Sequence, residues 1–100
     1  MKAIWNDTIV AEADKGELIR IEGNWYFPSD SLKREYFQDS DHHTVCHWKG
    51  EANYYDVVVG DKKNDFGAWY YPNPMEGSIE RVGSDFTDYV AFWNGIEITE

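Results

Sequence analysis

Residues 68–72 read Ala-Trp-Tyr-Tyr-Pro, and this stretch decides the fold that we predict. Its string Trp69-Tyr70-Tyr71-Pro72 repeats Trp25-Tyr26-Phe27-Pro28, which lies 44 residues earlier. Aromatic residues favour β-strands, and proline ends a strand because it has no backbone N–H group to donate to a neighbouring strand. Each string therefore predicts a short strand that stops at its proline.

Further strands are predicted along the chain, because other runs are also β-branched or aromatic and end at turn residues. The runs are 8–11, 17–22, 24–27, 54–59, 68–71, 88–93 and 96–99. Residues 60–65 are expected to form a polar loop between two strands, and Asn94-Gly95 is typical of a two-residue hairpin turn. We expect short helices at about 29–37 and 73–77, and a polar loop at 39–43.

A second string repeats at nearly the same spacing. Trp5-Asn6-Asp7, Trp48-Lys49-Gly50 and Trp93-Asn94-Gly95 follow one another at intervals of 43 and 45 residues. A chain rich in aromatic residues repeats some strings by chance, but two different strings in one register indicate an internal duplication.

The duplication predicts a single domain over residues 1–100, with similar halves at about 5–47 and 48–92 and a closing strand at 93–99. The expected fold class is mainly β. Two short antiparallel sheets would pack as a tent or sandwich about a pseudo-twofold axis, with one or two short helices.

Composition and charge exclude several classes of protein. Nine Lys and Arg residues against 19 Asp and Glu residues give a net charge of −10, which repels a phosphate backbone, so we expect no nucleic-acid partner. No apolar run approaches the roughly 20 residues of a membrane span, so we expect no membrane association. The single cysteine, Cys46, cannot form an intrachain disulfide, which favours a reducing cytoplasm.

Three longer strings carry a resemblance to a known family: Cys46-His47-Trp48-Lys49-Gly50-Glu51-Ala52-Asn53-Tyr54-Tyr55, Ala68-Trp69-Tyr70-Tyr71-Pro72 and Tyr89-Val90-Ala91-Phe92-Trp93. Over about residues 9–98 the chain resembles the small bacterial family catalogued as domain of unknown function 427. The resemblance implies a compact, mostly β fold like a tent of two short antiparallel sheets, and it implies little about activity. One departure is His47, where the family commonly has proline.

The family is sometimes labelled nucleotidyltransferase-like. That chemistry uses a Gly-Ser pair followed, about a dozen residues on, by paired carboxylates that hold Mg²⁺. In this chain Gly83-Ser84 is followed by Asp85 and Asp88 and then by apolar residues. The residues therefore assign no such reaction, and they do not decide whether the protein is an enzyme.

Cys46 and the nearby histidines suggest a catalytic or metal site, and we weighed both against a structural role. Lys49 could stabilise a thiolate, but free cysteines are among the most buried residues, so we expect Cys46 to be structural. In a strand, Cys46 and His47 would point to opposite faces, and His43 would lie about 13 Å from His47. We therefore expect no metal site and no cofactor.

A difference between the halves points to a binding site. At four matched positions Asn6, Ala11, Glu12 and Phe27 correspond to Lys49, Tyr54, Tyr55 and Tyr71. The second half thus carries polar groups on its rings, as a ring-lined pocket with a few hydrogen-bond donors requires. We predict that the ligand-binding residues are Trp48, Lys49, Tyr54, Trp69 and Tyr71.

Two functions of different classes follow from these observations. The first is the binding of a small planar or apolar molecule, with Lys49 paired to an anionic or carbonyl group. The second is an acidic protein–protein interaction module without a catalytic site, whose exposed rings meet a basic partner. A closed aromatic hollow favours the first, and a flat exposed patch of rings favours the second.

Overall fold

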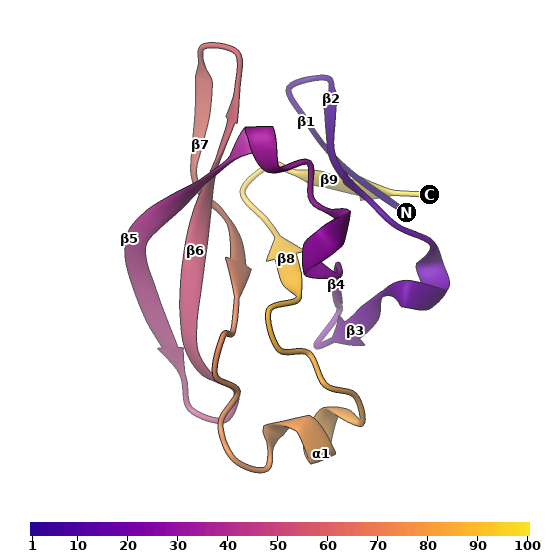
Figure 1. Ribbon diagram of the computed structural model, residues 1–100, viewed down its shortest axis with the longest axis vertical. Coiled ribbons are helices and arrows are strands. Elements are labelled where there is room, and N and C mark those ends of the chain that lie inside the picture. The colour runs from indigo at the N-terminus through magenta and orange to yellow at the C-terminus, as the bar shows by residue number, and fades with distance from the viewer.

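The computed structural model describes residues 1–100 and contains three small antiparallel sheets (Figure 1). The first has the order β2-β1-β9, with β1 at Lys2–Trp5, β2 at Thr8–Glu12 and β9 at Glu97–Thr99. The second is the hairpin of β3 (Ile19–Ile21) and β4 (Asn24–Tyr26). The third runs β5 (Phe37–Cys46), β6 (Gly50–Val59), β7 (Lys62–Tyr70), β8 (Val90–Phe92). The mainly β class is therefore confirmed.

The helical segments are short. Single turns of 3-10 helix occupy Lys15–Glu17, Ser29–Ser31 and Arg34–Tyr36, and the one α-helix, α1, spans Ser78–Val82. In Figure 1, α1 lies at the end of the molecule where the turn between β5 and β6 is found, and the two chain ends lie side by side because β1 pairs with β9.

The interior consists of two apolar clusters. The first includes Phe27, Val57 and Phe92, and the second includes Tyr26 and Phe86. Strand β8 separates them, since successive side chains of a strand point to opposite faces and all three of its residues are buried. The radius of gyration of 12.9 Å is close to the value of about 13 Å expected of a compact 100-residue domain.

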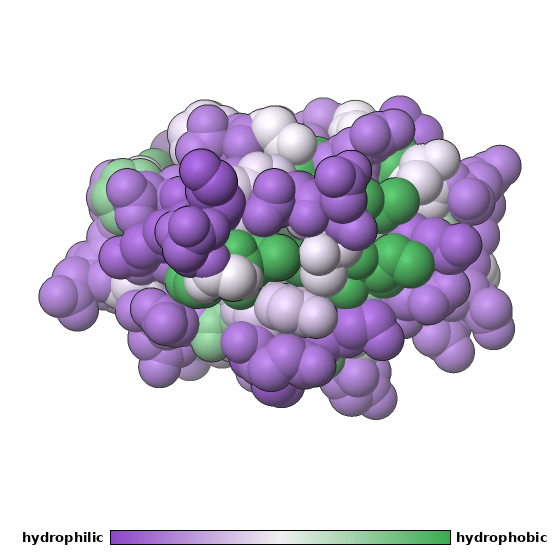
Figure 2. All heavy atoms as spheres, turned by 90° about the horizontal axis from the view of Figure 1, so that it is seen from above, coloured by the Kyte–Doolittle hydropathy of each residue, from purple (hydrophilic) through white to green (hydrophobic).

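Polar residues cover most of the outside. Seen from above, apolar side chains gather in the middle of one face and hydrophilic residues surround them (Figure 2). The exposed large apolar side chains are Val45, Phe66, Met75 and Trp93. Two of these, Phe66 and Trp93, lie beside the site described below.

Five predictions about sheets, helices and loops need correction. Two sheets were expected and the structure has three. Strand β9, from the far end of the chain, joins β1, and β3 pairs only with β4. The helix expected at 29–37 is replaced by two 3-10 turns. Between them Lys33 donates its N–H to the carbonyl of Val10, 2.9 Å away, so the segment bonds to strand β2 and not along a helix.

The helix expected at 73–77 lies instead at Ser78–Val82, just after this segment. Met75 donates its N–H to the carbonyl of Lys49 at 2.9 Å, and this bond to the β5–β6 turn holds the segment in a non-helical form. Gly77 and Gly83, both at positive φ, bound the helix.

The polar loop predicted at 39–43 is part of β5, which keeps its pairing with β6 through a register shift between Asp39 and His43. The predicted loop at 60–65 is also shorter than expected. β6 ends at Val59 and β7 begins at Lys62, so only two residues form the turn.

The repeated strings occupy similar local settings. Trp5 ends β1 before a turn and Trp48 lies in the turn after β5, while Trp25 and Trp69 each lie in the second strand of a hairpin. The pairing beyond these hairpins differs, because only β7 forms a ladder with β8. Superposition of halves 5–47 and 48–92 stays a prediction.

Candidate functional site

Four of the five predicted site residues line one hollow of about 240 Å³: Lys49, Tyr54, Trp69 and Tyr71. Trp93 completes its lining. The fifth predicted residue, Trp48, does not line this hollow. We call the space bounded by these four rings and one lysine the aromatic hollow.

The sheet brings these side chains together. Tyr54 of β6 and Trp69 of β7 are paired directly across the two strands. Tyr71 follows Trp69 by two residues, so the two side chains share a face. Trp93, just after β8, meets Trp69 edge to face with 6.3 Å between ring centroids. Lys49 enters from the turn between β5 and β6.

Trp69, the central ring of the hollow, is held in place by a residue of the core. Trp69 donates its Nε1–H to the hydroxyl of Tyr26 at 3.1 Å, and the two rings meet at 90°. Tyr26 is fully buried, and burial raises the pKa of its hydroxyl. Tyr26 therefore belongs to both the core and the support of the site.

Lys49 is buried, with 7% of its surface exposed. Its ammonium forms a hydrogen-bonded ion pair with Glu22 and lies 5.2 Å from the ring centroid of Trp48 and 5.5 Å from that of Tyr71. Burial is the largest single influence and lowers the pKa of Lys49, but the hydrogen bond to Glu22 and the charges of neighbouring groups together outweigh it, so the pKa of Lys49 is raised. The hydrogen bond from Lys49 lowers the pKa of Glu22. Both groups are therefore charged at neutral pH.

Tyr71 supplies a second donor. It is 4% exposed, and its hydroxyl has no side-chain hydrogen bond. No buried polar side-chain atom lacks a partner, so this hydroxyl is accessible to water, and Tyr71 lines the hollow. Burial raises the pKa of Tyr71 well above its usual value, which keeps the hydroxyl protonated. A charged donor and a neutral donor thus lie beside the same rings, an arrangement suited to an acidic or carbonyl group.

Trp48 lies beside Lys49 but lines a neighbouring hollow and not the aromatic hollow. The guanidinium of Arg81, on α1, lies 4.3 Å from its ring centroid. Trp48 and Arg81 line a neighbouring hollow of about 280 Å³ together with Arg20 and Glu22. Trp48 and Lys49 are consecutive residues of one turn, but they line different hollows.

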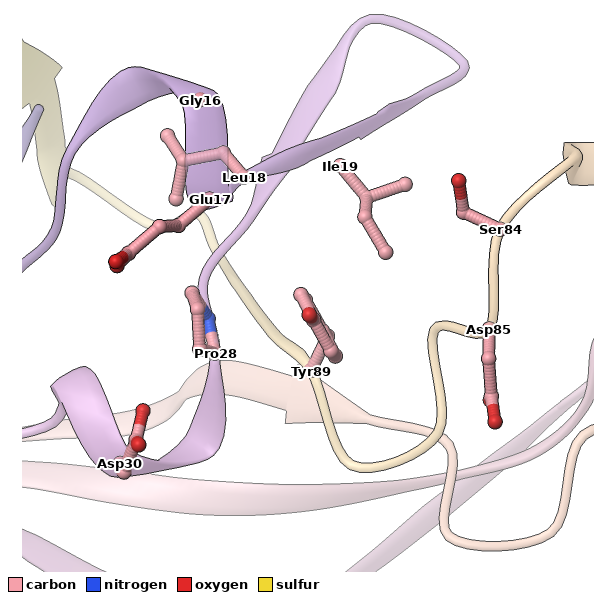
Figure 3. A pocket seen from close by; sticks show the side chains of 9 residues that line it. All are labelled: Gly16, Glu17, Leu18, Ile19, Pro28, Asp30, Ser84, Asp85 and Tyr89. Atoms are coloured by element: carbon pink, nitrogen blue, oxygen red, sulfur yellow. The ribbon is translucent and has the colours of Figure 1, made fainter.

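A larger hollow of about 590 Å³ lies elsewhere, beside Tyr89 (Figure 3). Its acidic residues Glu17, Asp30 and Asp85 come from three segments, and Figure 3 shows their carboxylates pointing in different directions. Asp85 accepts hydrogen bonds from Thr87, which lower its pKa. These carboxylates do not form an acid–base pair, so we assign no chemistry to this hollow.

The histidines and Cys46 do not meet at one point. Cys46 is half-buried against the second apolar cluster, and the ring of His43 lies 2.8 Å from the side-chain oxygen of Asn53. No group of three or more His, Cys, Asp or Glu side chains is placed to hold a metal ion.

Three contributors to the site were missed from the sequence: Glu22, Tyr26 and Trp93. Trp93 carried a signal, since it belongs to the repeated Trp strings. Glu22-Gly23 is the two-residue turn between β3 and β4, with φ of 52° and 83°. Nothing local in the sequence places that turn beside Lys49, which is 27 residues further on.

The fold and the aromatic hollow define a small, mainly β domain with one cation set among rings. The chain matches the sequence model of the family described as "Domain of unknown function (DUF427)" over residues 1–99, and it belongs to that family. This confirms the resemblance seen in the sequence. No curated protein matches the chain. None of its helices is long and apolar enough to cross a membrane.

Proposed function

We propose that the protein binds a small planar molecule in the aromatic hollow, with an acidic or carbonyl group of that molecule beside Lys49. The observation that carries this proposal is that four rings and one lysine line the same hollow. Aromatic side chains hold planar ligands by edge and face contacts, and a few placed donors fix the orientation of the ligand.

The size of the hollow narrows the ligand. Its 240 Å³ is smaller than the roughly 300–1,000 Å³ of pockets for drug-sized ligands. One ring with a short polar arm is therefore the expected size. The unpaired Cys46 supports a cytoplasmic location for this binding.

A second candidate is the interaction module, and one observation favours it. Trp93 is 50% exposed and Phe66 is 37% exposed, and the indole N–H of Trp93 donates to the carbonyl of Phe66. With a net charge of −10, these rings would suit a basic partner.

The two candidates are separated by an NMR titration of ¹⁵N-labelled protein with a panel of single-ring acids, amides and alcohols. We expect the indole N–H signals of Trp69 and Trp93 to shift while that of Trp25 does not. Trp93→Ala should weaken binding about tenfold by removing one wall, equivalent to about 1.4 kcal/mol. Trp25→Ala, the matched control outside the hollow, should leave binding unchanged.

If no compound of the panel shifts the Trp69 signal, the small-molecule proposal is wrong. A basic peptide that shifts Trp93 and the Phe66 amide, in the absence of any small-molecule binding, would favour the interaction module instead.

A further inference from the structure

The ion pair between Lys49 and Glu22 is uneven. The side chain of Lys49 is 9% exposed, whereas that of Glu22 is 56% exposed. Glu22 is also the one hydrogen-bond acceptor that the protein offers the ammonium, which has three donors. The buried ammonium of Lys49, which lines the aromatic hollow, is therefore neutralised by the exposed carboxylate of Glu22.

The position of Glu22 in the fold leaves its carboxylate room to move. Glu22 lies in the two-residue turn between β3 and β4. The pairing of these two strands holds the backbone of the turn, and the neighbouring residues Gly23 and Asn24 are exposed like Glu22. An exposed carboxylate loses little solvation on leaving its partner or returning to it.

A second cation lies near Glu22. Arg81 lines the same 280 Å³ hollow as Glu22, and its charge acts on the Glu22 carboxylate. Arg81 forms no ion pair within 4 Å and stacks on Trp48. A carboxylate that leaves Lys49 therefore has another cation to approach.

We propose that Glu22 is a displaceable carboxylate: the carboxylate of a small aromatic acid entering the aromatic hollow replaces Glu22 on Lys49, and Glu22 turns outward toward Arg81. This inference rests on the proposed function and narrows its ligand to single-ring carboxylic acids. Glu22 lines the neighbouring hollow, and the acid group of the ligand takes over its hydrogen bond to the Lys49 ammonium from the side of the aromatic hollow.

Charge balance favours exchange over simple addition. Two carboxylates on one ammonium would leave a net negative charge beside buried rings, in a chain that already carries a charge of −10. Exchange keeps one carboxylate on Lys49 throughout. Lys49 cannot follow Glu22 into water without leaving the rings of Trp48 and Tyr71.

The test uses benzoate and its neutral analogue benzamide, titrated into the ¹⁵N-labelled full chain with the Trp69 indole signal as readout. Glu22→Gln removes the competing charge and keeps the shape of the side chain. We expect this variant to bind benzoate about tenfold more tightly than the unsubstituted protein. Its affinity for benzamide should change by less than about twofold, because an amide does not compete for the charge of Lys49.

Two further variants complete the design. Glu12→Gln, an exposed site in β2, makes the same change in net charge and should leave benzoate affinity unaltered. In a protein that carries Lys49→Met, adding Glu22→Gln should no longer favour benzoate. The affinities for benzoate and benzamide should then change by the same factor.

The outcomes separate the two proposals. Equal benzoate affinity in the unsubstituted protein and Glu22→Gln, with binding still at Trp69, overturns the exchange and leaves the binding function standing. An equal gain in Glu12→Gln would also overturn it, because the gain would then come from net charge alone. If neither probe shifts Trp69 in any variant, the binding function itself fails.

Discussion

Replacing Tyr26 by phenylalanine tests whether the core holds the central ring of the site. The change keeps the buried ring and removes the oxygen that accepts the hydrogen bond from Trp69 at 3.1 Å. Leaving a buried donor unpaired costs about 1–3 kcal/mol. Because Trp69 is only half-buried and water reaches part of it, we expect the lower part of this range, about 1–2 kcal/mol.

Urea unfolding followed by tryptophan fluorescence measures this loss, and the midpoint should fall while the m-value stays constant. The melting temperature should fall by about 4–8 °C for each kcal/mol in a domain of this size. Tyr36→Phe is the control, since Tyr36 is half-buried against the first cluster and its hydroxyl has no side-chain hydrogen bond. Equal midpoints for the two variants would refute the idea that Tyr26 holds Trp69.

Two further predictions concern packing and charge. Gly67→Ala would put a Cβ atom 2.7 Å from the side-chain oxygen of buried Asn64, so thermal unfolding should show a loss of about 1–3 kcal/mol. Gly16→Ala, with no atom within 4 Å, should show no such loss. In the ion pair, Lys49 lowers the pKa of Glu22 from 4.5, so the pair contributes stability above that value and loses it as the pH falls through the lowered pKa. Urea midpoints of Glu22→Gln should therefore lie below those of the unsubstituted protein at pH ~7 and meet them once the pH has fallen below the lowered pKa of Glu22, with a neutral-pH difference under about 1 kcal/mol.

The strands that could be predicted from the sequence are those with many buried apolar side chains. The predicted runs 54–59, 68–71 and 88–93 contain the second half of β6, the end of β7 and all of β8, where most β-branched and aromatic side chains are buried or half-buried. Residues 39–43 of β5 resemble a loop in sequence because this edge strand, unlike the buried edge strand β8, is mostly polar and exposed over residues 38–43. An edge strand needs few apolar residues, so its sequence resembles a loop.

Sheet number could not be predicted, because it depends on pairing between distant segments. Strand β1 is four residues long and pairs with β9, which ends at Thr99. No local pattern specifies that partner. The repeated Trp strings predicted strands at 24–27 and 68–71, but they carried no information on which sheet each strand would join.

The residues of the site also fall into those that could be predicted from the sequence and those that could not. The alternation of side chains predicts that Trp69 and Tyr71 share a face, and cross-strand pairing adds Tyr54. Tyr55, the next residue, points to the opposite face and stacks on Tyr70 with 4.7 Å between centroids. Glu22 could not be found this way, since only the packing of the β3–β4 hairpin brings it to Lys49.

Stability alone does not account for a lysine at position 49. Taking an ammonium out of water costs several kcal/mol. Glu22 and the neighbouring charges offset that cost, which is why the pKa of Lys49 is raised, but water screens a pair with an exposed carboxylate, so the pair adds little to stability. An uncharged side chain of similar size, such as methionine, would pack beside Trp48 and Tyr71 without that cost. Under the proposed function, the ammonium has a further role, since it would meet the acidic group of the ligand in the aromatic hollow. The same reasoning disfavours the larger hollow as the place for an acid, since the carboxylates that line it would repel one.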